Sequence, residues 1–121
     1  MFAPNILVLQ YFSFGERHLN IIHTRLRHNC ILNKDLFRCN IIGSPLCTCG
    51  SVEDDYHYFF SCNKYRNARY ELFNKIFNIE KLKIVNTHVL LWGDPSLSNE
   101  ENEYLFSLIH IFIKQSSRFN Q

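Results

Sequence analysis

The sequence predicts a small, mainly α-helical (all-α) domain built around one short segment rich in cysteine and histidine. Apolar residues recur at spacings of three and four in four separate stretches of the 121-residue chain, which is the period of an amphipathic helix. A hydrophobic content of 46%, with 15% aromatic residues, supplies enough apolar side chains for one packed core. We therefore expect residues 16–121 to form one domain of about five helices. Residues 1–15 form a lead-in without an assigned function, and the apolar run at 6–9 is the single strand-like signal.

The first half of the chain predicts two helices. The first begins at Glu16, and its apolar face combines residues spaced by three and four, namely Leu19, Ile22, Leu26 and Cys30. Its other side is basic, with Arg17, Arg25 and Arg27. Asn33 is expected to cap a short second helix that runs through Leu36 and Phe37. The Gly-Ser-Pro turn at 43–45 then separates this helix from the cysteine-rich segment.

The second half predicts three further helices. The clearest amphipathic one follows Cys62, and its predicted apolar stripe contains Tyr65, Ala68, Leu72, Phe73, Ile76 and Phe77. Residues 86–87 (Asn-Thr) are suited to cap a short helix that Gly93 ends. Ser98 and Glu101 have the spacing of a capping box, which predicts the start of a long core helix.

Four residues of metal-ligand type lie close together between positions 47 and 62: Cys47, Cys49, His57 and Cys62. Three thiolates and one imidazole satisfy the tetrahedral preference of zinc and leave no position for a substrate water, so such a site is structural. Gly50 directly follows the second cysteine, where a chelating turn needs a residue that adopts positive φ. These features predict a CCHC zinc knuckle over residues 44–65.

Two alternatives to this ligand set stay open at the level of sequence. Reduced cysteines often behave as small buried hydrophobic residues, so the four residues need not meet at a metal. One residue between the first two cysteines is also tighter than the usual two to four, so Cys39 or Cys30 could replace one of that pair. The acidic run at 53–55 predicts a helix N-terminus with His57 in its first turn. In α-helical geometry Cys62 falls off the face of His57, so we expect this helix to end near Cys62.

The charge distribution indicates basic segments on both sides of the cysteine-rich stretch. The formal net charge is only +2, but residues 16–40 and 63–83 are rich in lysine and arginine. Solvated faces of amphipathic helices explain this pattern as well as a binding surface does. The chain shows no signal peptide and no apolar run long enough for a bilayer, and the count of five cysteines is odd. We therefore expect reduced thiols, a cytoplasmic or nuclear location and no membrane partner.

The order of these motifs resembles the C-terminal zinc-binding region of non-LTR (LINE-type) retrotransposon reverse transcriptases. The resemblance extends from about Phe12 to Phe119. It is carried by the run His-Thr-Arg-Leu-Arg-His at 23–28, Leu-Asn at 32–33, Ser-Pro-Leu-Cys-Thr-Cys-Gly at 44–50, Glu-Asp at 53–54, His57, Cys62 and the run at 65–69. It implies zinc ligation by Cys47, Cys49, His57 and Cys62, and a basic surface that includes Arg25, Arg27 and Arg69. The polymerase domains that precede this region in the family are missing here, so its RNA-directed DNA synthesis is not carried over.

Catalytic interpretations of the cysteine-rich stretch are weaker. The acidic run at 53–55 offers paired carboxylates of the kind that hold catalytic metal ions, but turn and helix signals surround it instead of a β-hairpin. A Cys/His pair is present without a third group that would orient the histidine. We therefore expect no enzymatic activity.

The sequence thus predicts a zinc-stabilised nucleic-acid-binding module that takes up structural Zn²⁺ and binds RNA or DNA. The residues expected to contact phosphates are Arg25, Arg27, Lys64, Arg66 and Arg69, which the first helix and the helix after Cys62 would present as one surface. The alternative is a zinc-stapled helical module that binds a protein partner. Neither composition nor motif identifies the preferred nucleic acid.

Overall fold

The structure is a computed structural model that describes residues 15–119. Its helices within this range are α2 (Arg17–Arg27), α3 (Asn33–Arg38), α4 (Arg66–Ile76), α5 (Thr87–Trp92) and α6 (Asn99–Ser116), with a π-helical turn η1 (His57–Ser61) and a 3₁₀ turn η2 (Asn63–Tyr65). The described residues contain no strand and one isolated antiparallel bridge, between Leu46 and Val52. The predicted mainly helical fold is therefore confirmed over this range. The strand-like run at 6–9 lies outside the described residues.

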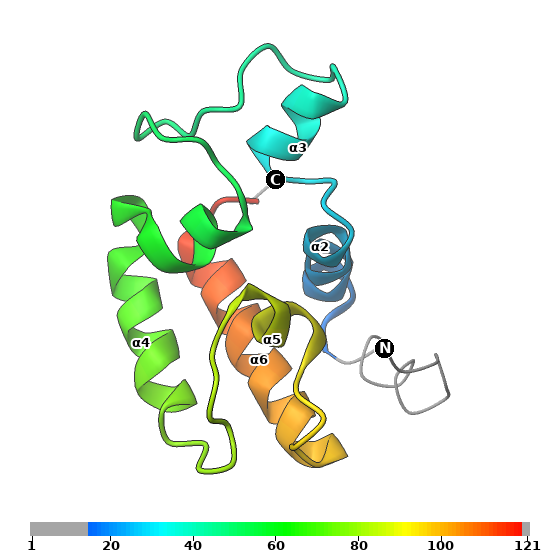
Figure 1. The fold of residues 1–121 in the computed structure, drawn as a ribbon, viewed down its shortest axis with the longest axis vertical. Helices are drawn as coiled ribbons and strands as arrows, with labels where there is room; N and C mark the ends of the chain where they lie inside the picture. The colour runs from blue at the N-terminus through cyan, green and yellow to red at the C-terminus, as the bar shows by residue number, and fades with distance from the viewer. Residues whose placement is uncertain (1–14, 120–121) are drawn as a thin grey trace.

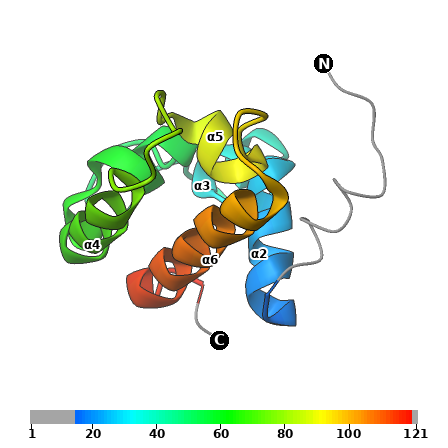
Figure 2. The ribbon, with the colours of Figure 1, turned by 90° about the horizontal axis from the view of Figure 1, so that it is seen from below.

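The long helix α6 is the centre of the molecule. Helix α4 packs along one side of α6, whereas α2 and α5 pack on the other (Figures 1 and 2). Helix α3 lies beyond the C-terminal end of α6, where Arg118 Nη2 donates to Asn33 Oδ1 at 3.1 Å (Figure 1). As a result, the segment between α3 and α4, which carries the cysteines, lies at the C-terminal end of α6.

Local capping accounts for where α5 and α6 begin. At the start of α6 the Glu101 amide donates to Ser98 Oγ at 3.1 Å, and the Ser98 amide donates to Glu101 Oε1 at 2.8 Å, so the predicted capping box is present. The Val89 amide donates to Asn86 Oδ1 at 2.9 Å at the start of α5, and Gly93 ends that helix with φ +82°. The predicted caps of these two helices are confirmed.

The prediction that Asn33 caps α3 is wrong. Leu32 occupies the cap position, and Asn33 is the first helical residue. The Asn33 amide donates to Glu53 Oε1 at 2.9 Å, and the Lys34 amide donates to the Glu53 carbonyl at 3.0 Å. A carboxylate and a carbonyl from the cysteine-rich segment therefore take the place of a local cap, because they come within reach only when the segment folds back on α3.

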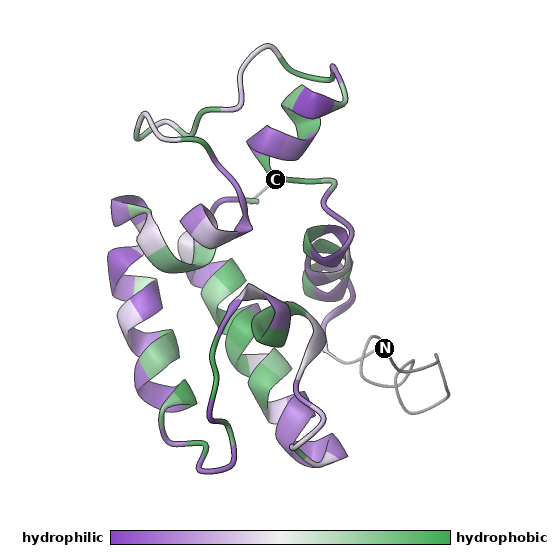
Figure 3. Cartoon of the chain, viewed as in Figure 1, coloured by the Kyte–Doolittle hydropathy of each residue, from purple (hydrophilic) through white to green (hydrophobic). Residues whose placement is uncertain are grey.

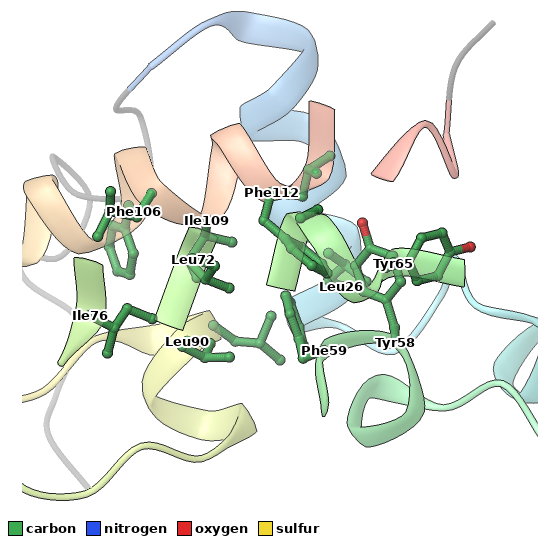
Figure 4. Packing of buried hydrophobic residues seen from close by; sticks show 14 of the residues in the cluster. Leu26, Tyr58, Phe59, Tyr65, Leu72, Ile76, Leu90, Phe106, Ile109 and Phe112 are labelled. Carbon is green, nitrogen blue, oxygen red and sulfur yellow. The ribbon is translucent and has the colours of Figure 1, made fainter. Parts of the chain in front are cut away.

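The core is formed by α6 and the helices around it, and it extends into the cysteine-rich segment (Figure 4). Figure 3 shows apolar residues concentrated along the middle of α6, where the other helices cover it. Tyr58 and Phe59, from the π-helical turn, are fully buried, and their rings lie 5.1 and 5.7 Å from the ring of Phe112 on α6. Full burial of an apolar side chain contributes roughly 1.5–3 kcal/mol to folding. The cysteine-rich segment is therefore anchored in the core by these two rings as well as by the buried Cys47 and Cys62.

One residue of the predicted apolar stripe on α4 lies outside the core. Ala68, Leu72 and Ile76 are buried, but Phe77 is 72% exposed. Buried positions on α4 are spaced by four residues and form a narrower band than predicted. Phe77 directly follows Ile76 and is turned by about 100° from it, which places its ring outside this band.

Candidate metal centre

The four predicted ligand residues come together in one cluster. The thiol sulfurs and the imidazole nitrogen of Cys47, Cys49, His57 and Cys62 all lie within 4.8 Å of one another. Cys47 Sγ is 3.8 Å from Cys62 Sγ, and Cys49 Sγ is 3.3 Å from His57 Nε2. Sulfurs about 2.3 Å from one tetrahedral zinc ion lie about 3.8 Å apart. The donor atoms are therefore of the types, and close enough together, to hold a metal ion.

The first two cysteines are carried by a tight turn. The Cys47 amide donates to the Ser51 carbonyl at 2.7 Å, and the Gly50 amide donates back to the Cys47 carbonyl at 2.9 Å. Gly50 has φ +99°, in the left-handed region where a side chain is strained, so the predicted need for glycine is confirmed. This turn brings Cys49 back toward Cys47. Both thiols therefore reach the same cluster, although only one residue separates the two cysteines.

The other two ligand residues lie at the ends of one π-helical turn. The Cys62 amide donates to the His57 carbonyl at 2.9 Å, five residues earlier, and Cys62 itself is extended. The predicted end of the helix at Cys62 is correct. In α-helical geometry we expected Cys62 to lie off the face of His57. The wider π-helical turn instead places Cys62 about one turn beyond His57, on the same side. Asp54 Oδ1 accepts from the His57 amide at 2.8 Å and stabilises the start of the turn.

Ser61 lies behind the histidine ring. Its Oγ is 3.2 Å from His57 Nδ1, on the side of the ring opposite the sulfurs. Because Nε2 faces Cys49, a metal bound there leaves the ring proton on Nδ1, which then donates to Ser61. Sequence analysis missed this residue, although its position directly before Cys62 and four residues after His57 was a usable signal.

Burial distinguishes the cysteines. Cys47 and Cys62 are buried, while Cys49 lies at the surface. Burial raises the pKa of the Cys62 thiol to about 11, whereas a hydrogen bond from the Ser51 backbone lowers the pKa of Cys49. An ion that binds the Cys62 sulfur must displace its proton. Cys30 and Cys39 are exposed and lie outside the cluster, so neither replaces a predicted ligand residue.

Arg69 belongs to the support of this site. Its Nε donates to the Phe59 carbonyl at 2.8 Å, and its Nη2 donates to the Cys62 carbonyl at 2.8 Å and the Tyr58 carbonyl at 3.4 Å. The Tyr58 and Phe59 carbonyls belong to the π-helical turn, and the Cys62 carbonyl, which follows it, also accepts from the Tyr65 amide at 3.2 Å. We predicted that Arg69 contacts phosphates. Its geometry favours a structural role instead, because its guanidinium already donates to backbone carbonyls.

Arg27 was expected on the basic surface, and this is wrong. It is only 5% exposed, its Nε donates to the Leu91 carbonyl, and its guanidinium carbon lies 5.1 Å from the centre of the Phe106 ring. The reason is that α5 and α6 cover this side of α2. Burial lowers the pKa of Arg27 to about 9.

The remaining predicted cations are exposed but do not form one surface. Arg25 lies on α2, whereas Arg66 lies on α4, and α6 separates the two helices (Figures 1 and 2). The predicted continuous surface across both helices is therefore wrong. Lys64 Nζ donates to Thr48 Oγ1 at 2.6 Å, which places this cation directly beside the metal-ligand turn.

The acidic residue next to the site is bound by an arginine from the chain end. Arg118 Nε and Nη2 each donate to a carboxylate oxygen of Glu53 at 2.7 Å, and Glu53 is 1% exposed. Burial opposes ionisation of Glu53, but hydrogen bonds from Arg118 and the Asn33 amide outweigh it and lower its pKa. Sequence analysis missed Arg118, since nothing local relates it to a residue 65 positions earlier.

Substitution of Ser61 by alanine is expected to weaken zinc binding without abolishing it. Loss of the oxygen that orients His57 Nδ1 removes an outer-shell contact of a kind that typically changes metal affinity 10- to 100-fold. Competition with a chromophoric chelator measures the change. Ser107→Ala, which removes an exposed hydroxyl on α6, is the control and should leave affinity unchanged. Equal affinities for both variants would contradict this role for Ser61.

No family model, curated protein or solved structure matches this chain in the comparisons made. Within residues 15–119, no helix combines the length and apolar character needed to cross a membrane.

Proposed function

We propose that this chain is a zinc-stabilised nucleic-acid-binding module. Its zinc ligands would be Cys47, Cys49, His57 and Cys62, which form a CCHC knuckle between α3 and α4. The proposal agrees with the resemblance of the sequence to the C-terminal region of non-LTR retrotransposon reverse transcriptases. The observation that carries it is the closed set of one imidazole and three thiol groups within 4.8 Å of one another.

A structural role for the ion follows from this donor set. Four protein ligands complete a tetrahedron, so no position remains for a water or a substrate. The bound ion would tie the turn at 47–50 to the π-helical turn that precedes α4. The proposal includes no catalytic role, in keeping with the burial of the Glu53 carboxylate against Arg118.

Nucleic-acid binding is supported by the exposed cations. Arg25, Lys64 and Arg66 are exposed, and no ion pair within residues 15–119 neutralises any of them. By contrast, Arg38 lies 3.4 Å from Asp35 and Lys81 lies 3.4 Å from Glu101. Lys64 and Arg66 flank the proposed zinc site, so the ion would hold them in place for phosphate contacts.

The zinc-loaded chain is expected to bind single-stranded nucleic acid with a marked salt dependence. Three phosphate contacts predict a slope of roughly −2 in a plot of log affinity against log salt concentration, from about −0.7 per contact. Fluorescence anisotropy with labelled single-stranded RNA, single-stranded DNA and duplex DNA measures it. Combined replacement of Arg25, Lys64 and Arg66 by alanine should flatten the slope while zinc content stays at one per chain.

A second triple variant controls for the change in net charge. This variant replaces Arg38, Lys81 and Lys83 by alanine and so removes the same charge from exposed positions. Arg38 and Lys81 are ion-paired in the parent, and the slope should stay unchanged. If the parent binds none of the three nucleic acids at low salt, or both triple variants behave alike, the nucleic-acid proposal fails. The zinc-stapled protein-interaction module then becomes the better interpretation of the same scaffold.

A further inference from the structure

Four aromatic rings form a continuous stack beside the proposed zinc site. Tyr56 stacks on Phe60 with ring centres 5.1 Å apart and 24° between planes. Phe60 stacks on Phe73 at 5.3 Å and 25°, and Phe73 stacks on Phe77 at 5.9 Å and 25°. We refer to these four residues as the aromatic ladder. It connects the π-helical turn that carries His57 to the C-terminal end of α4.

The two ends of the ladder are open to solvent. Phe60 and Phe73 are half-buried and pack against the core, whereas Tyr56 is 60% exposed and Phe77 is 72% exposed. The inner rings hold the outer ones in near-parallel orientation, so the outer faces of Tyr56 and Phe77 are fixed and accessible. Aromatic faces presented to water in this way mark a binding surface more often than isolated exposed side chains do.

A cation lies on the face of α4 that carries the ladder, whereas the Tyr56 end lies next to Asp55. Arg66, Tyr70, Phe73 and Phe77 follow one another at helical spacing and share a face of α4, and Tyr70 is 70% exposed. The one acidic residue of α4, Glu71, lies toward α6, where its carboxylate accepts a hydrogen bond from Gln115 at 3.3 Å. This face therefore combines open aromatic rings and a cation without a carboxylate from the same helix.

We propose that the aromatic ladder is a stacking platform for unpaired bases of a single-stranded nucleic acid. The inference rests on the proposed nucleic-acid function and deepens it. Every base has a π-face that stacks on Tyr or Phe, and Arg66 lies where it can meet the connecting phosphates. In a duplex the base faces already stack on one another, so the platform selects single strands with little sequence preference.

The test compares a base-bearing single-stranded oligonucleotide with an abasic one of equal length and phosphate count. Both are labelled, and binding to the zinc-loaded chain is measured by anisotropy at one salt concentration. The parent is expected to bind the base-bearing strand more tightly, by on the order of tenfold for each open ring. This comparison needs no variant and therefore does not depend on how a mutant folds.

The double variant Tyr56→Leu with Phe77→Leu localises the effect. Leucine keeps apolar volume but has no ring, and both positions are exposed, so the fold should persist. The affinity of this variant for the base-bearing strand should fall to its affinity for the abasic strand. The affinity for the abasic strand should equal that of the parent. Tyr104→Leu, at a 49% exposed position on α6, is the matched control and should retain the preference.

The outcomes separate this inference from the proposed function. Equal binding of both strands by the parent overturns the ladder platform but leaves phosphate-driven binding intact. A parent that binds neither strand at low salt removes the proposed function and the platform with it. Self-association of the parent that the double variant abolishes, with the strand preference unchanged, would make the ladder a protein interface and overturn the inference.

Discussion

Cys62→Ser is expected to abolish stoichiometric zinc binding and to cost the chain most of its stability. Structural zinc contributes on the order of 10 kcal/mol to folding in small zinc-binding peptides. That is comparable with the whole free energy of unfolding of an ordinary domain, about 5–15 kcal/mol. Cys62 is buried and follows directly on the turn that carries Tyr58 and Phe59 into the core. Loss of the metal should therefore loosen residues 44–65 first and then weaken packing against α6.

Elemental analysis and thermal unfolding followed by circular dichroism measure these two effects. A chelator added to the parent should lower its melting temperature as the substitution does. Cys39→Ser is the matched control, because Cys39 is exposed and lies outside the cluster, and it should change neither zinc content nor melting temperature. One zinc per chain retained by Cys62→Ser, or an unchanged melting temperature with chelator, would contradict the metal assignment.

Arg27→Ala is expected to lower the free energy of unfolding by about 2–4 kcal/mol. The substitution leaves the Leu91 carbonyl without its Arg27 donor and opens a cavity beneath the rings of Trp92 and Phe106, over which the guanidinium lies. Arg27→Met retains most of the volume and removes a charge that burial already disfavours, so its effect should be smaller. Urea unfolding of both variants measures the difference.

Arg25→Ala is the control two residues away. Arg25 is exposed, so its loss should change the free energy of unfolding by less than about 0.5 kcal/mol. The two variants should have the opposite order of effects on nucleic-acid binding. Arg25→Ala should flatten the salt dependence of the affinity, whereas Arg27→Met should leave it unchanged. A flattened salt slope for Arg27→Met at unchanged stability would show that the guanidinium reaches phosphates, contrary to its burial.

The candidate metal residues and the caps of α5 and α6 were readable from the sequence because both depend on short-range features. Residue type and close spacing pointed to Cys47, Cys49, His57 and Cys62 as one group. The capping box of Ser98 and Glu101 involves residues three positions apart, and its geometry is almost independent of the rest of the chain. Whether Cys30 or Cys39 belonged to the cluster, in contrast, required the path of the chain between α3 and α4.

The roles of the arginines could not be predicted in the same way. Arg25 and Arg27 look equivalent in sequence, but only Arg27 lies under α5, where it meets a carbonyl 64 residues further along the chain. Arg69 likewise looks like a surface cation until the π-helical turn places three carbonyls around it. Periodicity identifies which side of a helix is polar, but it does not say which polar residues a neighbouring element will cover.

The sequence by itself determined the helical class, the donor residues and the caps of the last two helices, since each is set by residues within a few positions of one another. Tertiary structure alone decided that Arg118 binds Glu53, that a π-helical turn aligns His57 with Cys62, and that Tyr56 and Phe77 end one aromatic stack. Apart from the π-helical turn, which is local, these contacts join distant parts of the chain. Their formation depends on how α4 and α6 pack. Burial of apolar surface drives this packing and is not directional, so the spacing of residues in the sequence does not show which partners will meet.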